Sequence, residues 1–145
     1  MNPLRSLGKR RQLVTAPPTA TVFETVRVMT ASQVGAIPII ENGRLTGIFS
    51  ERDLMQRVVA PELDPRRTFV SEVMTREVIT AKLDDRIDHC LERMRRAGCR
   101  HLPVEENGRV VKMIAMRDLL RGEIAEQGDE IRFLRAYLHQ TPPGD

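Results

Sequence analysis

The apolar and polar positions of this chain follow the same order twice. In the first half, apolar residues recur at helical spacing over 22–29, which predicts an amphipathic helix. Two short apolar runs come next, at 36–40 and 45–49, and Asn42-Gly43 separates them. Asn-Gly between two apolar runs is the strongest short-range signal of a β-hairpin, because both turn residues need a positive φ.

The second half repeats this order at a constant offset of 65 residues, the separation of Pro38 and Pro103. The register holds without a gap from 14 to 55 and from 79 to 120. Chance similarity would not keep one offset over such a length, so the chain is a tandem duplication. The matching segments include Glu41-Asn42-Gly43-Arg44 with Glu106-Asn107-Gly108-Arg109, and Arg52-Asp53-Leu54 with Arg117-Asp118-Leu119.

Each repeat therefore predicts a strand, a helix, two strands and a closing helix. Thr21 followed by Glu24 has the form of a capping box, and Asp84 or Asp85 is expected to cap the equivalent helix of the second repeat. One such unit cannot cover both faces of its sheet, so we expect the two to pack together. The fold class is α+β, built from tandem β-α-β-β-α units.

The domain organisation follows from these repeats. We place a basic N-terminal segment at 1–12, the first repeat at 13–60 and the second at 78–122. Residues 61–77 form the linker and a lead-in helix, and residues 123–145 form a C-terminal amphipathic helix and tail.

Paired repeats of this length and order resemble the CBS-domain pair, named after cystathionine β-synthase. The similarity rests on 70–75 before Val78-Ile79-Thr80, on the strands with a central proline, on the Asn-Gly hairpins and on 47–53. It implies two repeats packed about a pseudo-twofold axis, an adenine nucleotide bound between them, and a homodimer formed through the helices.

The segment Ser50-Glu51-Arg52-Asp53 has two compatible interpretations. As a capping box, Ser50 and Asp53 satisfy the start of a helix. As a ligand site, the helix start offers free N–H groups to a phosphate, and the carboxylate accepts hydrogen bonds from a ribose diol. The second repeat keeps Asp118 but has Ala115 in place of the serine, so it cannot complete the box.

The resemblance also implies two ligand-binding clefts, each facing parts of both repeats. The first, expected to be the main cleft, would contain Ile48, Ser50, Asp53, Ile79, Thr80, Arg100, His101 and Leu102. The second would contain Val14, Thr15, Ala36, Ile37, Met113 and Asp118. The first is favoured because it has a hydroxyl at Ser50 and because Arg100 and His101 are potential phosphate partners, although a basic pair at a strand edge is more often solvated surface.

The composition of the chain argues against several classes of function. Aromatic residues make up only 3% of the chain, which argues against the stacking platforms of single-stranded nucleic-acid binding. The net charge of +3 favours anionic small ligands or phosphate contacts but does not by itself imply DNA. No apolar run is long enough to span a bilayer and no secretory signal follows the basic N-terminus. We therefore expect a cytoplasmic protein in which Cys90 and Cys99 are reduced thiols.

Candidate chemistry for catalysis is missing from the sequence. The three histidines, His89, His101 and His139, have no metal-ligand spacing, and no phosphate-binding glycine loop occurs. We predict a regulatory module rather than an enzyme, sensing an adenine nucleotide such as AMP, ADP, ATP or NAD(H); Arg100 and His101 favour these over S-adenosylmethionine. The alternatives are a ligand-free interaction scaffold for a partner enzyme or transporter, and nucleic-acid binding through a basic face.

Overall fold

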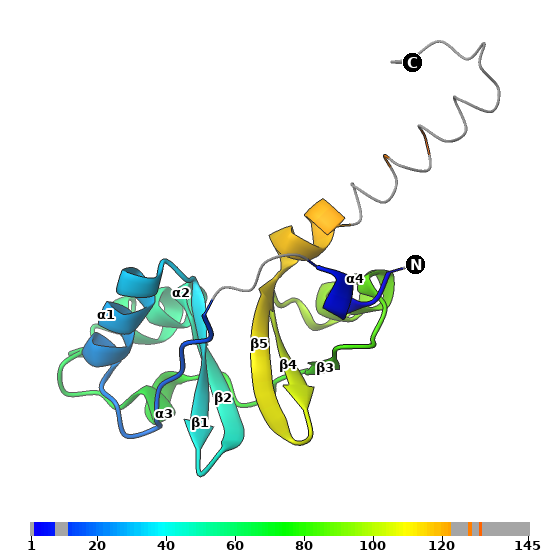
Figure 1. Cartoon of the computed structure of the whole chain (residues 1–145). Helices are drawn as coiled ribbons and strands as arrows, with labels where there is room; N and C mark the ends of the chain where they lie inside the picture. The colour runs from blue at the N-terminus through cyan, green and yellow to red at the C-terminus, as the bar shows by residue number, and fades with distance from the viewer. Residues whose placement is uncertain (1, 8–11, 123–127, 129–130, 132–145) are drawn as a thin grey trace.

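The computed structural model of the chain describes residues 2–7, 12–122, 128 and 131, and its elements repeat in the predicted order (Figure 1). Each repeat forms a helix and an antiparallel hairpin, and the two hairpins stand side by side. The elements of the first repeat are α1 (Val22–Ser32), β1 (Ala36–Glu41), β2 (Arg44–Ser50), α2 (Glu51–Asp53) and the π-helical η2 (Leu54–Val59). Those of the second are β3 (Ala81–Lys82), α4 (Ile87–Ala97), β4 (His101–Glu106), β5 (Arg109–Ala115) and a helix at 116–122.

The hairpin turns have the backbone that Asn-Gly predicts. Asn42 and Gly43 have φ of 52° and 78°, and Asn107 and Gly108 have φ of 54° and 78°. Both hairpins also contain a register shift at equivalent positions, between Ile39 and Ile40 and between Val104 and Glu105. The duplication therefore extends to the irregularities of the backbone, which confirms the predicted hairpins.

The first strand of each repeat is short. In the second repeat β3 pairs in parallel with β4, with Ala81 opposite Val104. In the first repeat the same pairing shrinks to one parallel bridge, Ala16 opposite Ile39, although both residues lie 65 positions before their counterparts. The predicted order of strand, helix, hairpin and helix is confirmed, and the two sheets differ only in how far this strand extends.

The two long helices begin differently. In α1 the predicted capping box is present: Glu24 N donates to Thr21 Oγ1 over 3.1 Å, and Thr21 N donates to Glu24 Oε1 over 3.2 Å. Helix α4 has Arg86 as its N-cap with no side-chain cap, so the prediction that Asp84 or Asp85 caps this helix was wrong. The N–H of Ile87, at the first position of the helix, donates instead to the carbonyl of Asn2 over 3.0 Å.

The two aspartates expected at that cap have other partners. Asp84 accepts a hydrogen bond from Arg5 Nε over 2.8 Å, and Asp85 accepts one from Lys82 N over 2.9 Å. Asp85 therefore stabilises the turn that precedes α4, whereas Asp84 joins that turn to the N-terminal segment.

The segments that precede the two repeats are exchanged between them. Helix α3 (Val70–Val73) leads into the second repeat but packs on the first, where Val70 N donates to Ala20 O over 2.8 Å. The 3₁₀ turn η1 (Leu4–Ser6) leads into the first repeat but packs on the second, where Leu4 N donates to Asp85 O over 2.9 Å. Each repeat thus depends on the other's lead-in segment for part of its core.

The chain has one apolar core in each repeat. Leu4 joins the core of the second repeat and Val70 that of the first, and neither side chain has any exposed area. The first core otherwise contains Ala16, Val22, Met29, Ile37, Ile39, Phe49, Val58, Val73 and Met74. The second contains Ala81, Leu83, Ile87, Cys90, Met94, Leu102, Val104, Ile114 and Leu119.

Two expectations concern parts of the chain at its ends. The predicted amphipathic helix at 123–145 lies outside the described residues, except that 128 and 131 are helical. Among the helices that the structure describes, none combines the length and the apolar content needed to cross a bilayer.

Candidate functional site

Two cavities lie between the repeats, where the sequence analysis expects clefts. The first has a volume of about 370 Å³ and is lined by Ser50, Asp53 and Thr75; we call it the Asp53 cleft. The second has a volume of about 690 Å³ and is lined by Met113 and Asp118; we call it the Asp118 cleft. Small-molecule sites in proteins typically measure roughly 300–1,000 Å³, so either cleft is large enough for a ligand.

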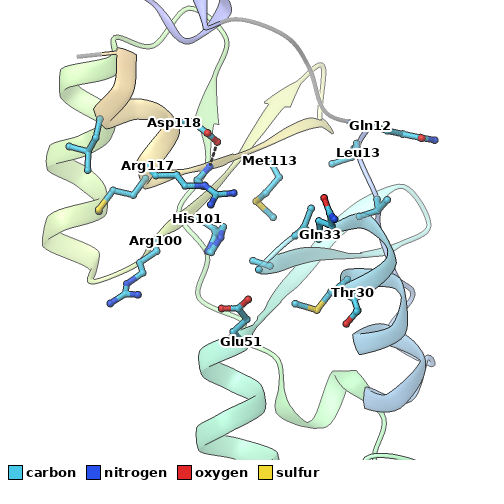
Figure 2. Close-up of a pocket in the computed structure, with 18 residues that line it drawn as sticks. Gln12, Leu13, Thr30, Gln33, Glu51, Arg100, His101, Met113, Arg117 and Asp118 are labelled. Carbon is cyan, nitrogen blue, oxygen red and sulfur yellow. Dashed lines mark hydrogen bonds between the residues drawn. The ribbon is translucent and has the colours of Figure 1, made fainter. Parts of the chain in front are cut away.

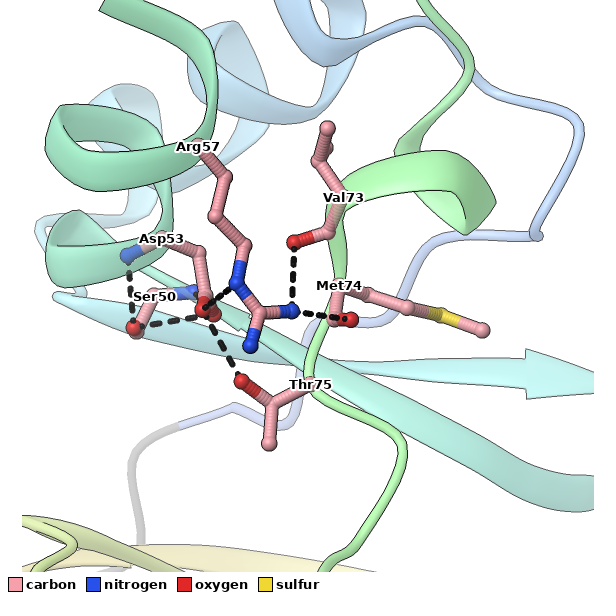
Figure 3. Close-up of polar contacts among 6 residues, drawn as sticks. All are labelled: Ser50, Asp53, Arg57, Val73, Met74 and Thr75. Atoms are coloured by element: carbon pink, nitrogen blue, oxygen red, sulfur yellow. Dashed lines mark hydrogen bonds and ion pairs between the residues drawn. The ribbon is translucent and has the colours of Figure 1, made fainter. Parts of the chain in front are cut away.

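The carboxylate of Asp53 is fully engaged by the protein itself (Figure 3). Its Oδ2 accepts hydrogen bonds from the backbone N and the Oγ of Ser50, both over 3.0 Å. Its Oδ1 accepts from Thr75 Oγ1 over 2.9 Å and lies 3.8 Å from Arg57 Nε. Asp53 N donates in return to Ser50 Oγ over 3.3 Å. The capping-box interpretation of this segment is therefore realised, and the side chain is only 5% exposed.

The guanidinium of Arg57 extends this network to the segment after α3. Its Nη1 donates to the carbonyls of Met74, over 2.9 Å, and Val73, over 3.3 Å. Thr75 itself pairs with β2, since its N–H and carbonyl both bond to Ile48. Close packing here requires Gly47, because a Cβ at that position would lie 2.8 Å from the Thr75 carbonyl oxygen. The Asp53 cleft therefore has a rigid, internally hydrogen-bonded wall.

The carboxylate of Asp118 is far less engaged. Its Oδ2 accepts one hydrogen bond, from Ala115 N over 3.2 Å, which reproduces half of the capping box of the first repeat. Its Oδ1 accepts no hydrogen bond from the part of the chain that the structure describes. The side chain is half-buried on the wall of a cavity nearly twice as large as the other. One acceptor oxygen is thus available to a ligand hydroxyl.

The two clefts share a wall. Gly35, Glu51, Arg100 and His101 line both of them, and Figure 2 shows Glu51, Arg100 and His101 together at one end of the Asp118 cleft. Arg100 and Glu51 are exposed, whereas His101 is half-buried. The two potential phosphate partners predicted for the main cleft, Arg100 and His101, therefore line both clefts.

The environment of His101 favours its neutral form. Burial lowers the pKa of His101, the Glu51 carboxylate and, more weakly, Asp118 oppose this shift, and Arg117 and Arg100 add to it. The lowered pKa favours the neutral imidazole at pH 7, which offers one donor and one acceptor. Arg100 and Arg117 remain as the cations that can meet a phosphate in the Asp118 cleft.

Most of the predicted site residues line the cleft to which they were assigned. Six of the eight assigned to the main cleft line the Asp53 cleft, while Leu102 is buried in the second core and Thr80 lines another cavity. Four of the six assigned to the second cleft line the Asp118 cleft, while Ile37 is buried in the first core and Thr15 is exposed outside it. Consecutive strand residues point to opposite faces, which explains why Ile37 and Leu102 lie in the cores while their neighbours Ala36 and His101 line a cleft. The six are Ile48, Ser50, Asp53, Ile79, Arg100 and His101, and the four are Val14, Ala36, Met113 and Asp118.

Several lining residues were not predicted. Gln12 and Leu13 reach the Asp118 cleft from the segment before the first strand, and Gln33 reaches it from the end of α1. Gln33 adopts a left-handed backbone with φ of 55° as the helix ends. Glu51 and Arg117 follow the strand ends, one position and two positions after Ser50 and Ala115 respectively. Glu51 lies inside the segment Ser50-Glu51-Arg52-Asp53 and Arg117 directly precedes Asp118, so the predicted motifs already indicated their neighbourhood.

Comparison with known proteins identifies the family. The CBS domain model matches the chain twice, over residues 5–60 and 70–124. The chain belongs to the CBS domain family. The resemblance inferred from the sequence is therefore confirmed, together with the fold of a tandem pair.

Two curated relatives and one solved structure illustrate this CBS pair's similarities. The chain is 36% identical over 118 residues to the CBS domain-containing protein CBSCBSPB2 of Arabidopsis thaliana, a match that covers 77% of this chain and 22% of that protein. It is 30% identical over 116 residues to the CBS domain-containing protein YhcV of Bacillus subtilis, covering 80% and 82%. A CBS domain protein of Pyrobaculum aerophilum complexed with AMP matches with a TM-score of 0.73 and 30% identity, over 81% of this chain and 89% of that one. The chain thus spans about a fifth of the plant relative and most of the bacterial one.

The two cysteines of this CBS pair are thiols of low reactivity. Cys90 and Cys99 are both free thiols, and burial raises the pKa of Cys90 to about 11. Burial also raises the pKa of Cys99, and a thiol of raised pKa is a poor nucleophile at neutral pH. Within the described residues, no group of three His, Cys, Asp or Glu side chains has the arrangement of a metal site.

Proposed function

We propose that this CBS pair is a regulatory module that binds an adenine nucleotide between its repeats. The observation that carries the proposal is the available carboxylate oxygen of Asp118, placed in a cavity of about 690 Å³ whose wall also contains Arg100 and Arg117. A ribose diol can donate to the carboxylate, and the guanidinium groups can pair with the phosphate. AMP in the complex of the Pyrobaculum aerophilum protein supports a ligand of this class.

The proposal places the principal site in the Asp118 cleft. The sequence favours the Asp53 cleft, but a ligand there must replace hydrogen bonds that Asp53 already makes with Ser50 and Thr75. Breaking a buried, satisfied bond and replacing it with a ligand bond gives little net free energy. The adenine nucleotides AMP, ADP, ATP and NAD(H) all fit this chemistry.

Binding would act as a signal because both clefts are formed by the two repeats together. A ligand that contacts Ala36 of the first repeat and Asp118 of the second favours the relative orientation in which it binds best. The regulated protein, the cytoplasmic location, the homodimer and the absence of catalysis remain predictions. Val28, Met55 and Val59 on α1 and η2 are exposed apolar side chains, in agreement with association through these helices.

Calorimetric titration of the full chain tests the site. AMP, ADP, ATP, NAD, NADH and S-adenosylmethionine are titrated into the wild type, Asp118→Ala and Asp53→Ala. We expect one or more of the nucleotides to bind, with affinity reduced about tenfold or more by Asp118→Ala, because a hydrogen bond to a charged group contributes roughly 1.5–3 kcal/mol. Asp53→Ala should retain most of the affinity.

The outcomes separate the alternatives. Loss of affinity in Asp53→Ala alone would move the principal site to the Asp53 cleft. Failure of all six ligands to bind protein that is folded and free of copurified nucleotide would favour the interaction scaffold instead. Thermal denaturation provides an independent readout, since a ligand at a hundredfold excess over its Kd stabilises the folded state by about 2.7 kcal/mol.

A further inference from the structure

A third cavity lies at the hairpin tips, apart from the two clefts. It has a volume of about 700 Å³ and is formed by the turns of both hairpins and by the connection between α3 and β3; we call it the hairpin cavity. It shares no lining residue with the Asp118 cleft and only Val78 with the Asp53 cleft. In Figure 1 the cyan and yellow hairpin tips point the same way, and the green connection passes beside them.

The connection presents alternate residues to two different cavities. Arg76 and Thr80 line the hairpin cavity, whereas Glu77 and Ile79 line the Asp53 cleft. This alternation is that of an extended chain, in which successive side chains point to opposite faces. The hairpin cavity is therefore a separate concave surface with its own set of side chains.

Three arginines from distant parts of the chain line this cavity. Arg44 and Arg109 are equivalent residues of the two repeats, each directly after an Asn-Gly turn, and Arg76 belongs to the connection. All three are exposed, and none forms an ion pair within the residues that the structure describes. Arg76 donates one hydrogen bond, from Nη2 to the Ser71 carbonyl over 2.8 Å, which orients its guanidinium.

The residues that line the cavity carry a net positive charge. Glu105 is the one carboxylate among the lining residues that the structure describes, so the lining carries three positive charges and one negative. Glu41 and Glu106 are the cross-strand partners of Arg44 and Arg109. They do not line the cavity, and they form no ion pair with these arginines in the described chain. Asn42 and Asn107 add neutral hydrogen-bonding groups to the lining.

We propose that the hairpin cavity binds a compact anion with two or more linked phosphate groups. Guanidinium groups bind phosphate oxygens through paired, charge-assisted hydrogen bonds. A diphosphate or triphosphate chain carries enough charge to engage Arg44 and Arg109 from the two repeats at once. Arg76, on the connection between the repeats, is a third possible partner. The phosphate chain can belong to an inorganic polyphosphate or to the tail of a nucleoside triphosphate, and the chemistry of recognition is the same.

Titration calorimetry of the full chain with tripolyphosphate tests this site. The test variant is the double substitution Arg44→Ala/Arg109→Ala, and Arg76→Ala is a second one. The matched control is Arg95→Ala/Arg96→Ala, which removes the same charge from exposed positions on α4 that pair with Glu92. We expect the test double variant to weaken tripolyphosphate binding by about tenfold or more and the control double variant by less than about twofold.

Two further arms assign the ligand. Arg100→Ala removes the cation shared by the clefts and should leave unchanged the part of tripolyphosphate binding that depends on Arg44 and Arg109. Binding of ATP in the Arg100→Ala/Asp118→Ala background, lost on adding Arg44→Ala/Arg109→Ala, would identify a nucleotide tail as a source of the phosphate chain; binding of tripolyphosphate alone would identify the inorganic anion.

Four results would overturn the proposal. They are no binding of tripolyphosphate, equal weakening by the control double variant, loss of binding in Arg100→Ala alone, and tighter binding of a DNA duplex with the same dependence on Arg44 and Arg109. The last result would assign the surface to nucleic acid rather than to a small anion. Circular dichroism spectra of all variants verify that they are folded.

Discussion

The two clefts of this CBS pair are built from equivalent residues, yet their aspartates differ in how many hydrogen bonds they accept from the protein. Asp53 accepts hydrogen bonds from Ser50 and Thr75 and lies near Arg57, so both of its oxygens are used inside the protein. Asp118 accepts one bond, from Ala115 N. A single change from a serine to an alanine between the repeats, together with the lead-in segment that supplies Thr75, decides whether this carboxylate is structural or available to a ligand.

The lead-in segments explain how such a difference arises in a duplicated chain. The first repeat receives α3, whose continuation places Thr75 beside Asp53 and pairs it with Ile48. The second receives residues 2–7, with Leu4 in the core. Equivalent positions therefore meet different neighbours, and the Asp53 side becomes rigid while the Asp118 side keeps an open cavity.

The largest expected effect comes from breaking the exchange of lead-in segments. Leu4→Ala removes a side chain with no exposed area from the core of the second repeat. We expect a loss of about 2–5 kcal/mol in the free energy of unfolding, as for other buried Leu→Ala substitutions. Urea denaturation followed by circular dichroism measures it.

An exposed leucine serves as the control for this substitution. Leu63 is 42% exposed in the linker, and Leu63→Ala should cost less than about 1 kcal/mol. An equally small cost for Leu4→Ala would show that the N-terminal segment is not part of the second core in solution.

A smaller effect is expected from removing each aspartate in turn. Asp53→Ala leaves Thr75 Oγ1 and the start of α2 without an acceptor, and we expect the free energy of unfolding to fall by about 1–3 kcal/mol. Asp118→Ala removes one acceptor from a half-buried position and should cost about 1 kcal/mol or less. Urea denaturation of both variants without ligand measures the difference; equal costs would contradict the contrast between the two carboxylates.

The sequence was sufficient for the repeats and the hairpins, because these depend on local patterns. Asn-Gly turns, apolar periodicity and Thr21 with Glu24 each act within a few residues. The cap of α4 was mispredicted because its partner, Asn2, lies 85 positions before Ile87. No local pattern reports such a distant contact.

The site was predicted to the level of segments but not of side chains. Adjacent pairs such as Ala36 with Ile37, and His101 with Leu102, were assigned to a cleft together, although strand alternation places one of each pair in a core. That error could have been avoided from the sequence. The engagement of Asp53 by Thr75 could not, because it depends on the three-dimensional path of the segment after α3.

The smallest expected effect comes from Ala115→Ser. This substitution tests whether the missing hydroxyl is the only reason that the second repeat has an incomplete capping box. Ala115→Ser should let the new hydroxyl accept from Asp118 N and donate to Oδ2, as Ser50 does for Asp53. We expect the free energy of unfolding to rise by about 1 kcal/mol, the usual contribution of an N-cap side chain. Nucleotide affinity should stay within about twofold, since Oδ1 remains available. Unchanged stability would mean that the backbone at Ala115 does not present a cap, and a large loss of affinity would mean that Oδ2 is the oxygen that the ligand uses.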